Sequence, residues 1–196
     1  MGSKGKQMNT LFDIMPDTPE GFTYEKDFIT ASEETELIRL IIEFDLQNMQ
    51  FHQYEAKRKV ISFGHGWSFT QQMLKEGNPI PHGFQFLVAR IAERLSIRKD
   101  QIAQFLITEY PIGSVINWHR DAPPFSIIAG VSLLSDCTFK LRPQEKSKQT
   151  RKATISLPVE RRSLYTMQGE SKTEWQHSTV ALKTVRYSLT FRTLVS

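Results

Sequence analysis

The second half of the chain consists of short apolar segments of strand length. Pro, Gly or charged residues separate these segments, which from Gln101 onward read QFLITEY, SVINW, FSIIAGVSLL, TFKLR, ATISL, SLYTM, STVAL and RYSLTFRTL. Many short strands at such spacing are typical of a β-sandwich, a barrel or a jelly roll. We therefore expect a mostly β fold of this kind.

Two amphipathic helices are predicted ahead of these strands. The first begins near Thr30, which forms a capping-box pattern with Glu33, and continues with apolar residues at helical spacing to about Phe44. The second extends from about Phe84 to Leu95 and follows the turn-rich EGNPIPHG. Between them, FHQYEAKRKVISFGHGWSF has no helical period and predicts strands and loops. We expect both helices to cover a sheet.

The length of 196 residues fits one domain. We expect a disordered tail over residues 1–20 and a single domain over residues 21–196. The longest apolar run, FSIIAGVSLL, is well short of the roughly 18 residues that a membrane helix needs. The single cysteine, Cys137, cannot form a disulfide within the chain and suits a reducing compartment. We therefore expect a monomer without a membrane partner, in the cytoplasm or, in a eukaryotic cell, the nucleus.

The stretch NWHRDAPPF places ionisable residues beside an apolar strand. His119 and Asp121 are two positions apart, so on an extended segment both side chains project to one face. A solvated loop is one explanation for them, and a metal site is the other. Together with His177 in EWQHSTV, they would form a facial triad of two histidines and one carboxylate. The open coordination positions of such a triad suit non-heme Fe(II) chemistry with dioxygen.

The last strand-like segment, RYSLTFR, places Arg186, Ser188, Thr190 and Arg192 on one face. If this face points to solvent, the segment is an ordinary half-buried edge strand. If it points inward, two arginines enter the interior, where they need anionic partners. A dianionic cosubstrate that chelates the iron would meet that need.

Positive charge is concentrated in one part of the chain. The formal net charge is only +4, but residues 140–162 contain eight Lys or Arg and two Glu, which is a local net charge of +6. Such a cluster attracts phosphates. The alternative is a solvated hairpin whose tip is RPQEKSKQTRK.

Six motifs in order resemble those of the AlkB family of Fe(II)- and 2-oxoglutarate-dependent dioxygenases. They are RKVISFG, PIPHGF, ITEYPIGSVINWHRD, GVSLLSDCTFKLR, RRSLYTMQGESKTEWQH and RYSLTFR, between about residues 57 and 194. The resemblance implies an α+β, mostly β fold: a double-stranded β-helix (jelly roll) with N-terminal helices. It also implies a nucleotide-recognition lid over about residues 50–80, a catalytic core over residues 101–196, and the use of Fe(II), 2-oxoglutarate and O2.

The resemblance also assigns expected roles to individual residues. The expected iron ligands and catalytic residues are His119, Asp121 and His177. The expected 2-oxoglutarate contacts are Tyr110, Arg186 at the distal carboxylate, Arg192 near the metal-bound end, and Ser188 and Thr108 at positions where asparagine is frequent. The expected substrate contacts are His65, Trp67 and Phe69 by stacking or at phosphates, and Arg58, Arg142 and Arg161 at phosphates. For the three lid residues, closure of a small core is the alternative.

The implied activity is oxidative demethylation of N-alkylated bases in DNA or RNA, as in DNA repair or RNA demethylation, with release of formaldehyde, succinate and CO2. DNA-repair members carry a second acidic residue two positions after the metal aspartate, where this chain has Pro123. The base and the type of nucleic acid therefore stay open. Two alternatives remain: an oxygenase of the same class that acts on a protein or small molecule, and a non-catalytic nucleic-acid-binding module.

Overall fold

The computed structural model describes residues 16–51, 54–68 and 71–195. Most of the tail predicted over residues 1–20 lies outside this part of the chain. The helices are α1 (Ala31–Ile41), α2 (Gln85–Arg94) and the short α3 (Glu170–Thr173), with 3-10 turns η1 (His82–Phe84), η2 (Lys99–Gln101) and η3 (Lys146–Lys148). No helix in the described ranges has the length and apolar character needed to cross a membrane.

Strands dominate the described residues. They are β1 (Phe22–Glu25), β2 (Gln47–Phe51), β3 (Tyr54–Ser68), β4 (Met73–Glu76), β5 (Ile102–Tyr110), β6 (Phe125–Leu133), β7 (Cys137–Pro143), β8 (Ile155–Val159), β9 (Leu164–Met167), β10 (Trp175–Thr179) and β11 (Arg186–Leu194). The mostly β prediction is therefore confirmed.

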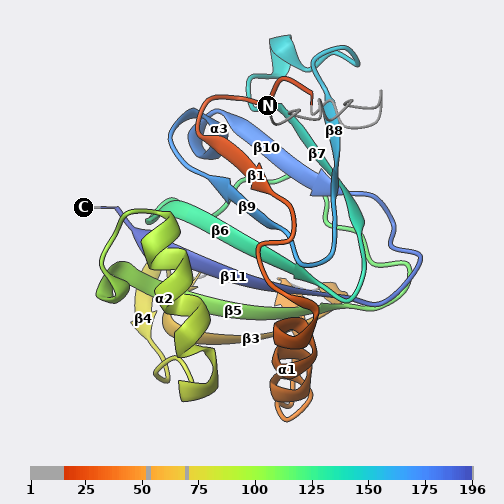
Figure 1. The fold of residues 1–196 in the computed structure, drawn as a ribbon. Coiled ribbons are helices and arrows are strands. Elements are labelled where there is room, and N and C mark those ends of the chain that lie inside the picture. The colour runs from red at the N-terminus through yellow and green to blue at the C-terminus, as the bar shows by residue number, and fades with distance from the viewer. Residues whose placement is uncertain (1–15, 52–53, 69–70, 196) are drawn as a thin grey trace, which may run out of the picture.

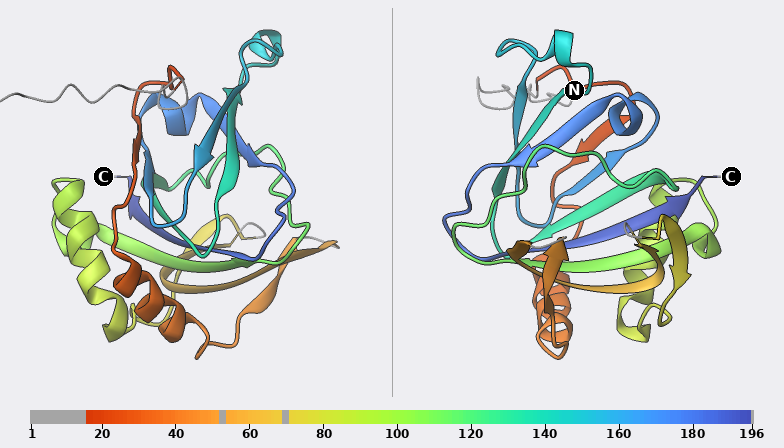
Figure 2. Two further views of the ribbon diagram at one scale, coloured as in Figure 1. Left: turned by 45° about the vertical axis from the view of Figure 1, so that its right-hand side comes forward. Right: turned by 180° about the vertical axis from the view of Figure 1, so that it is seen from behind.

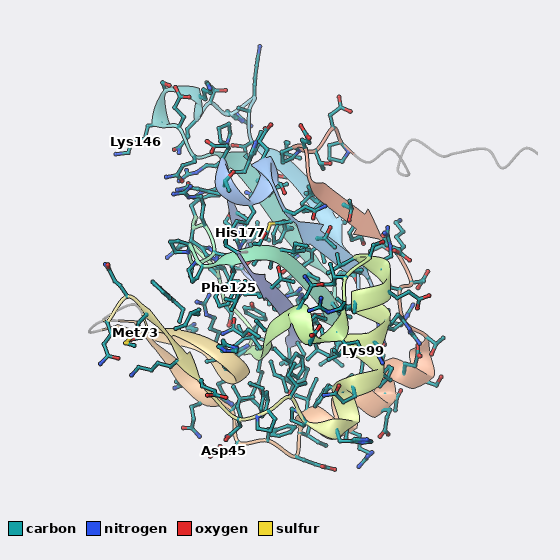
Figure 3. All side chains as sticks on the ribbon, turned by 90° about the vertical axis from the view of Figure 1, so that its left-hand side faces the viewer. Asp45, Met73, Lys99, Phe125, Lys146 and His177 are labelled. Carbon is teal, nitrogen blue, oxygen red and sulfur yellow. The ribbon has the colours of Figure 1, made fainter. Side chains whose placement is uncertain are left out.

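The strands form two antiparallel sheets. The larger sheet has the order β1-β9-β6-β11-β5-β3-β2, with β4 paired to β3, and the smaller sheet has the order β10-β7-β8. Figure 2 shows the smaller sheet across from the curved larger sheet, as in a jelly roll. The hairpin that joins β7 to β8 projects away from the larger sheet, and Figure 3 shows Lys146 at its outer end.

Both predicted helices cover the outer face of the larger sheet (Figure 1). The predicted capping box is present in α1, because Glu33 N–H donates to Thr30 Oγ1 at 3.2 Å and Thr30 N–H donates to Glu33 Oε2 at 2.8 Å. The apolar stripes of the helices pack against phenylalanines from the sheet. Phe105 of β5 is central there, with ring centroids 4.8 Å from Phe191 and 4.9 Å from Phe84.

A second apolar cluster lies on the other face of the larger sheet, between the two sheets. It includes Phe125, Phe139 and Tyr165, and the last two have ring centroids 5.1 Å apart. Because the larger sheet has apolar contacts on both faces, its central strands are buried on both sides. The inner face is the one that carries polar side chains as well.

The structure decides one alternative that the sequence left open and corrects two details of the strand prediction. The last strand is not an edge, because β11 pairs with β5 on one side and with β6 on the other. SVINW is not a strand: its backbone bonds irregularly to residues 179–182, and only His119 forms an isolated bridge, to His177. The burial of SVINW alternates as in a strand, so it is the missing strand pairing that separates the segment from one. Finally, only the first two residues of STVAL are extended, at the end of β10.

Candidate active site

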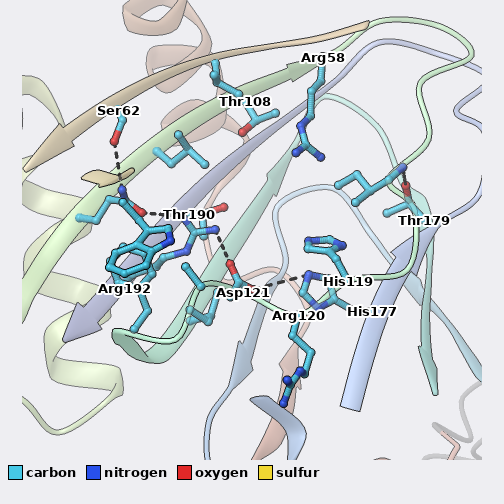
Figure 4. Close-up of a pocket in the computed structure, with 18 of the residues that line it drawn as sticks. Arg58, Ser62, Thr108, His119, Arg120, Asp121, His177, Thr179, Thr190 and Arg192 are labelled. Carbon is cyan, nitrogen blue, oxygen red and sulfur yellow. Dashed lines mark hydrogen bonds and ion pairs between the residues drawn. The ribbon is translucent and has the colours of Figure 1, made fainter. Parts of the chain in front are cut away.

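A cavity of about 330 Å³ lies between the two sheets. The inner face of the larger sheet forms one wall, with alternate residues of β5 and β11, and β3 contributes from beside them. His177 of β10 and the segment after β5, which carries His119 and Asp121, close the opposite side (Figure 4). Residues that are distant in sequence therefore meet here.

Two histidines and a carboxylate lie side by side in this cavity. The imidazole centroids of His119 and His177 are 4.1 Å apart, and His177 Nε2 is 3.6 Å from Asp121 Oδ2. The bridge between the two histidines sets this proximity, since each backbone N–H donates to the other residue's carbonyl. His119 Nδ1 is 2.8 Å from the Asn117 carbonyl, so in the neutral ring this nitrogen carries the proton and Nε2 keeps a free lone pair.

Burial and neighbouring charges keep these groups in the protonation states of metal ligands. Burial lowers the pKa of His177 to about 3, with a further contribution from His119, and burial also lowers the pKa of His119. Burial of Asp121 opposes its ionisation, but the positive charge of Arg192 and its hydrogen bond to the carboxylate outweigh that effect and lower the pKa of Asp121 to about 2. The histidines are therefore neutral and the aspartate is ionised near neutral pH.

Arg192 is held at one end of the cavity by polar groups. Its Nη2 donates to Asp121 Oδ1 at 2.5 Å and its Nη1 donates to Gln104 Oε1 at 2.6 Å. The register of β11 on β5 sets this arrangement, because Arg192 lies opposite Gln104. The Arg192 Nε is buried and has no hydrogen-bond partner among the residues that the structure describes. A buried donor without an acceptor is unusual and indicates room for an acceptor from a ligand.

Arg186 is the second arginine of β11 that faces inward. It is 3% exposed, and its guanidinium lies 5.3 Å from the centroid of the Tyr110 ring, directly across the β11–β5 pair. Its Nε donates to Ser132 Oγ at 2.8 Å. No ion pair between Arg186 and a carboxylate is present among the described residues. A buried guanidinium in this position favours an anionic ligand.

The fit of a metal ion depends on the donors that the cavity offers. Among the described residues, no three His, Cys, Asp or Glu side chains are arranged as a ready-made cation cluster. His119, Asp121 and His177 nevertheless supply two neutral imidazoles and one carboxylate, a donor set that suits Fe(II). Arg192 is bonded to Asp121 Oδ1, which leaves Oδ2, 3.6 Å from His177 Nε2, as the oxygen that could bind the ion.

Most of the predicted site residues meet in this cavity. Its lining contains the following of them: His119, Asp121, His177, Tyr110, Thr108, Arg186, Arg192, Arg58 and Trp67. Ser188 is buried in β11 on the same face but does not line the cavity.

The other predicted substrate contacts do not line it. His65 lies with Nδ1 3.3 Å from the Ala103 carbonyl. Arg142 donates to Gln176 and lies 4.3 Å from the centroid of the Trp118 ring. Arg161 is paired with Glu34 beneath α1. Phe69 lies outside the described residues.

The structure adds four residues that sequence reasoning did not select. Gln104 lies on the same face of β5 as Thr108 and Tyr110, so strand alternation could have indicated it. Tyr165 of β9 lines the cavity, and Ser132 of β6 contacts Arg186. Arg120 also lines the cavity, although alternation predicts that it faces away, and its guanidinium donates to the Thr173 carbonyl. No sequence signal singles out the last three.

Comparison with known proteins gives three findings. The sequence model of the 2OG-Fe(II) oxygenase superfamily matches residues 21–192. The chain is 26% identical over 182 residues to a curated mouse (Mus musculus) protein, tRNA (carboxymethyluridine(34)-5-O)-methyltransferase ALKBH8, and the match covers 89% of this chain and 26% of that protein. The chain thus spans about a quarter of that relative. The solved structure of OsALKBH1 matches with a TM-score of 0.69 and 14% identity, over 92% of this chain and 100% of that one, and shows a shared fold.

Proposed function

Because the chain belongs to the 2OG-Fe(II) oxygenase superfamily, we propose that it oxidatively demethylates N-alkylated bases in DNA or RNA. It is an AlkB-like dioxygenase, and its family uses Fe(II), 2-oxoglutarate and O2. The observation that carries the proposal is the cavity in which His119, Asp121 and His177 face two inward arginines. The release of formaldehyde, succinate and CO2 is part of the proposal.

The proposed iron ligands are His119 Nε2, His177 Nε2 and the Asp121 carboxylate. Bound iron supplies the coupling of 2-oxoglutarate decarboxylation to the insertion of one oxygen atom from O2 into a substrate C–H bond. The protein keeps both imidazoles neutral and holds the His119 ring through the Asn117 carbonyl. Arg192 keeps the Asp121 carboxylate ionised.

The proposed 2-oxoglutarate contacts come from β11 and β5. Arg186 binds the distal carboxylate, because it is a buried cation that the described residues leave without a carboxylate. Tyr110 flanks that guanidinium, and Thr108 adds a hydroxyl on the same face of β5. Arg192, with its unpartnered Nε, lies toward the metal end. Ser188 is buried on β11 between the two arginines.

The proposed substrate side is the part of the cavity that faces β3. Trp67 supplies an aromatic face for a flipped base, and Arg58 extends into the cavity on the side of His119 (Figure 4). The segment of about residues 50–80, with β2, β3 and β4, is proposed as the lid, in which His65 and Phe69 are further contacts. The name of the mouse relative describes an enzyme that acts on a modified uridine of tRNA, which supports the inclusion of RNA among the substrates.

The proposed phosphate contacts lie outside the cavity. Arg142 is half-buried against Trp118 on the smaller sheet, and the β7–β8 hairpin beyond it carries exposed lysines and arginines. Arg161 is exposed over about half of its side chain, but its guanidinium is bonded to Glu34. We therefore expect Arg142 to contribute more to nucleic-acid binding than Arg161.

The test is a formaldehyde assay with the full chain, Fe(II), 2-oxoglutarate, O2 and a panel of methylated DNA and RNA oligonucleotides. We expect formaldehyde and succinate in equal amounts from at least one oligonucleotide, and none with His119→Ala. Succinate formation that only a protein or a small molecule stimulates would assign another substrate to the same enzyme class. Oligonucleotide binding without any 2-oxoglutarate turnover would leave only a binding module.

A further inference from the structure

The formal charge of the cavity is positive. Among its described lining residues are four arginines, Arg58, Arg120, Arg186 and Arg192, and a single carboxylate, Asp121. Fe(II) and the 2-oxoglutarate dianion have opposite charges of equal size, so their binding leaves this sum unchanged. Arg192 already compensates Asp121, and Arg186 is available for the distal carboxylate of 2-oxoglutarate. The part of the cavity left for a substrate is therefore lined by cations.

Arg58 is the arginine that β3 contributes to the cavity. It extends from β3 into the cavity on the side of His119 (Figure 4). Arg58 and both histidines line the same cavity. A substrate base that lies between β3 and these histidines therefore meets Arg58.

The charged side chain that contacts Pro123 is a lysine and not a carboxylate. Lys172 of α3 donates from Nζ to the Pro123 carbonyl at 3.4 Å. Arg120 is held nearby through its bond to the Thr173 carbonyl, on the same short helix. Apart from Asp121 itself, none of the described residues that line the cavity carries a carboxylate.

N-alkylated bases fall into two classes that such a cavity would distinguish. Alkylation at N3 of cytosine or N1 of adenine gives a cationic ring. Alkylation at N3 of uracil or N1 of guanine replaces a lactam N–H and leaves an uncharged ring, with a carbonyl at C4 of uracil or C6 of guanine where cytosine and adenine carry an amino group. A guanidinium has N–H donors and no acceptor. It binds a carbonyl oxygen, but it repels a cationic ring whose exocyclic amino group also can only donate.

On the basis of the function proposed above, we infer that the cavity selects uncharged, carbonyl-bearing alkylated bases over cationic ones, with Arg58 as the specificity-determining residue. Arg58 donates to the carbonyl oxygen at C4 of uracil or C6 of guanine, the position that carries an amino group in cytosine and adenine, and this contact turns the alkyl carbon toward the histidines. Trp67, which is half-buried in the cavity wall, stacks on the ring face without regard to its charge. Discrimination therefore comes from charge and carbonyl recognition, and stacking adds affinity for both classes.

The test uses two single-stranded RNA oligonucleotides of identical sequence, one with a single 3-methyluracil and the other with a single 3-methylcytosine at the same position. Both are present in one reaction, and mass spectrometry follows the loss of each methylated base. We expect kcat/KM for 3-methyluracil to exceed that for 3-methylcytosine by at least about 10-fold, because like charges near a low-dielectric cavity repel strongly. Arg58→Met should reduce the ratio to within about 3-fold, and Arg58→Lys should still disfavour 3-methylcytosine.

The matched control is Arg98→Met, since Arg98 is exposed just before η2 and outside the cavity; this variant should keep the wild-type ratio. Binding of the two oligonucleotides to the metal-free protein, followed by fluorescence anisotropy, gives a second readout that does not require turnover. Thermal unfolding of each variant shows whether the fold is intact.

The outcomes separate this inference from the proposed function. Equal processing of both bases, a preference for 3-methylcytosine, or an unchanged ratio in Arg58→Met would overturn the inference and leave a nucleic-acid demethylase. Failure to process any methylated oligonucleotide, with 2-oxoglutarate turnover intact, would overturn both.

Discussion

At the scale of single residues, the candidate site depends on ionisable side chains that are held in one protonation state. His177 is the clearest case, because burial lowers its pKa from an ordinary 6.5 to about 3. The folded protein keeps this imidazole neutral over a pH range in which the unfolded chain binds a proton. The burial of this ring therefore determines both the pH dependence of stability and the neutral state that a metal ligand needs.

The pH dependence of stability follows from that difference. Because the unfolded state binds more protons below about pH 6.5, the free energy of unfolding should decrease as the pH falls from there toward 3. Between pH 7 and pH 5, His177 alone should account for about 2 kcal/mol. Asp121 has a lowered pKa of about 2, so its contribution is lost only below its ordinary value of 3.8 and does not affect this interval.

Urea unfolding of the metal-free protein at pH 7 and pH 5 measures this effect. His177→Gln should reduce the difference between the two pH values, whereas His82→Gln, on exposed η1, should leave it unchanged. Equal stability of the wild-type protein at both pH values would show that the imidazole is not held neutral by burial.

Arg186 gives a second prediction for a single residue. Replacing it with Met keeps much of the side-chain volume and removes the charge that we assign to the distal carboxylate of 2-oxoglutarate. A charge-assisted hydrogen bond contributes about 1.5–3 kcal/mol, so KM for 2-oxoglutarate should rise at least about 10-fold. Initial rates of succinate formation at increasing 2-oxoglutarate concentrations measure this, and a normal KM in a folded Arg186→Met would exclude the assignment.

At the scale of helices and strands, Glu34 joins α1 to the larger sheet. Its carboxylate is buried, with 1% of the residue exposed, and accepts from the Leu134 N–H at 2.8 Å. Arg161 donates to it at 2.5 Å, and Arg162 Nη1 lies at 3.7 Å. This role explains why Arg161, in a segment that the sequence marks as basic, is directed toward the body of the protein instead of solvent.

Glu34→Gln should destabilise the protein by about 3 kcal/mol, because the charged partner of a partly buried ion pair is removed and the arginines lose their anion. Glu36→Gln is the matched control: Glu36 is on the same helix, exposed over about half of its side chain and paired with the exposed Arg39. Its effect should be below about 1 kcal/mol. Denaturant unfolding compares the two, and equal effects would contradict the structural role of Glu34.

The sequence predicts those elements whose signal is local. The capping box and apolar spacing of α1 depend on neighbouring residues, and the ends of β6 and β11 depend on alternation and punctuation. The segment SVINW has the residue types of a strand, but its partners are residues 179–182, which follow the end of β10. The orientation of the polar face of β11 is set by its two partner strands, β5 and β6. The alternation of β11 alone therefore left both orientations open.

At the scale of the whole molecule, antiparallel pairing brings residues from distant segments into one cavity. The sequence predicts nine residues of that lining, because the metal and cosubstrate positions belong to a family pattern. Arg120 and Tyr165 have no such signal: packing between the two sheets sets the place of Tyr165, and a hydrogen bond to the Thr173 carbonyl sets that of Arg120. The positive charge of the cavity also becomes apparent only when the lining is assembled, since the chain as a whole has a net charge of only +4.

The central claim is that this cavity removes alkyl groups from nucleic-acid bases. The most direct measurement is mass spectrometry of a mixed pool of methylated DNA and RNA before and after incubation with the protein, Fe(II), 2-oxoglutarate and O2. We predict the loss of at least one methylated nucleoside, with formaldehyde released in the same amount, and no change with Asp121→Ala. An unchanged pool in a reaction that still converts 2-oxoglutarate to succinate would contradict the account.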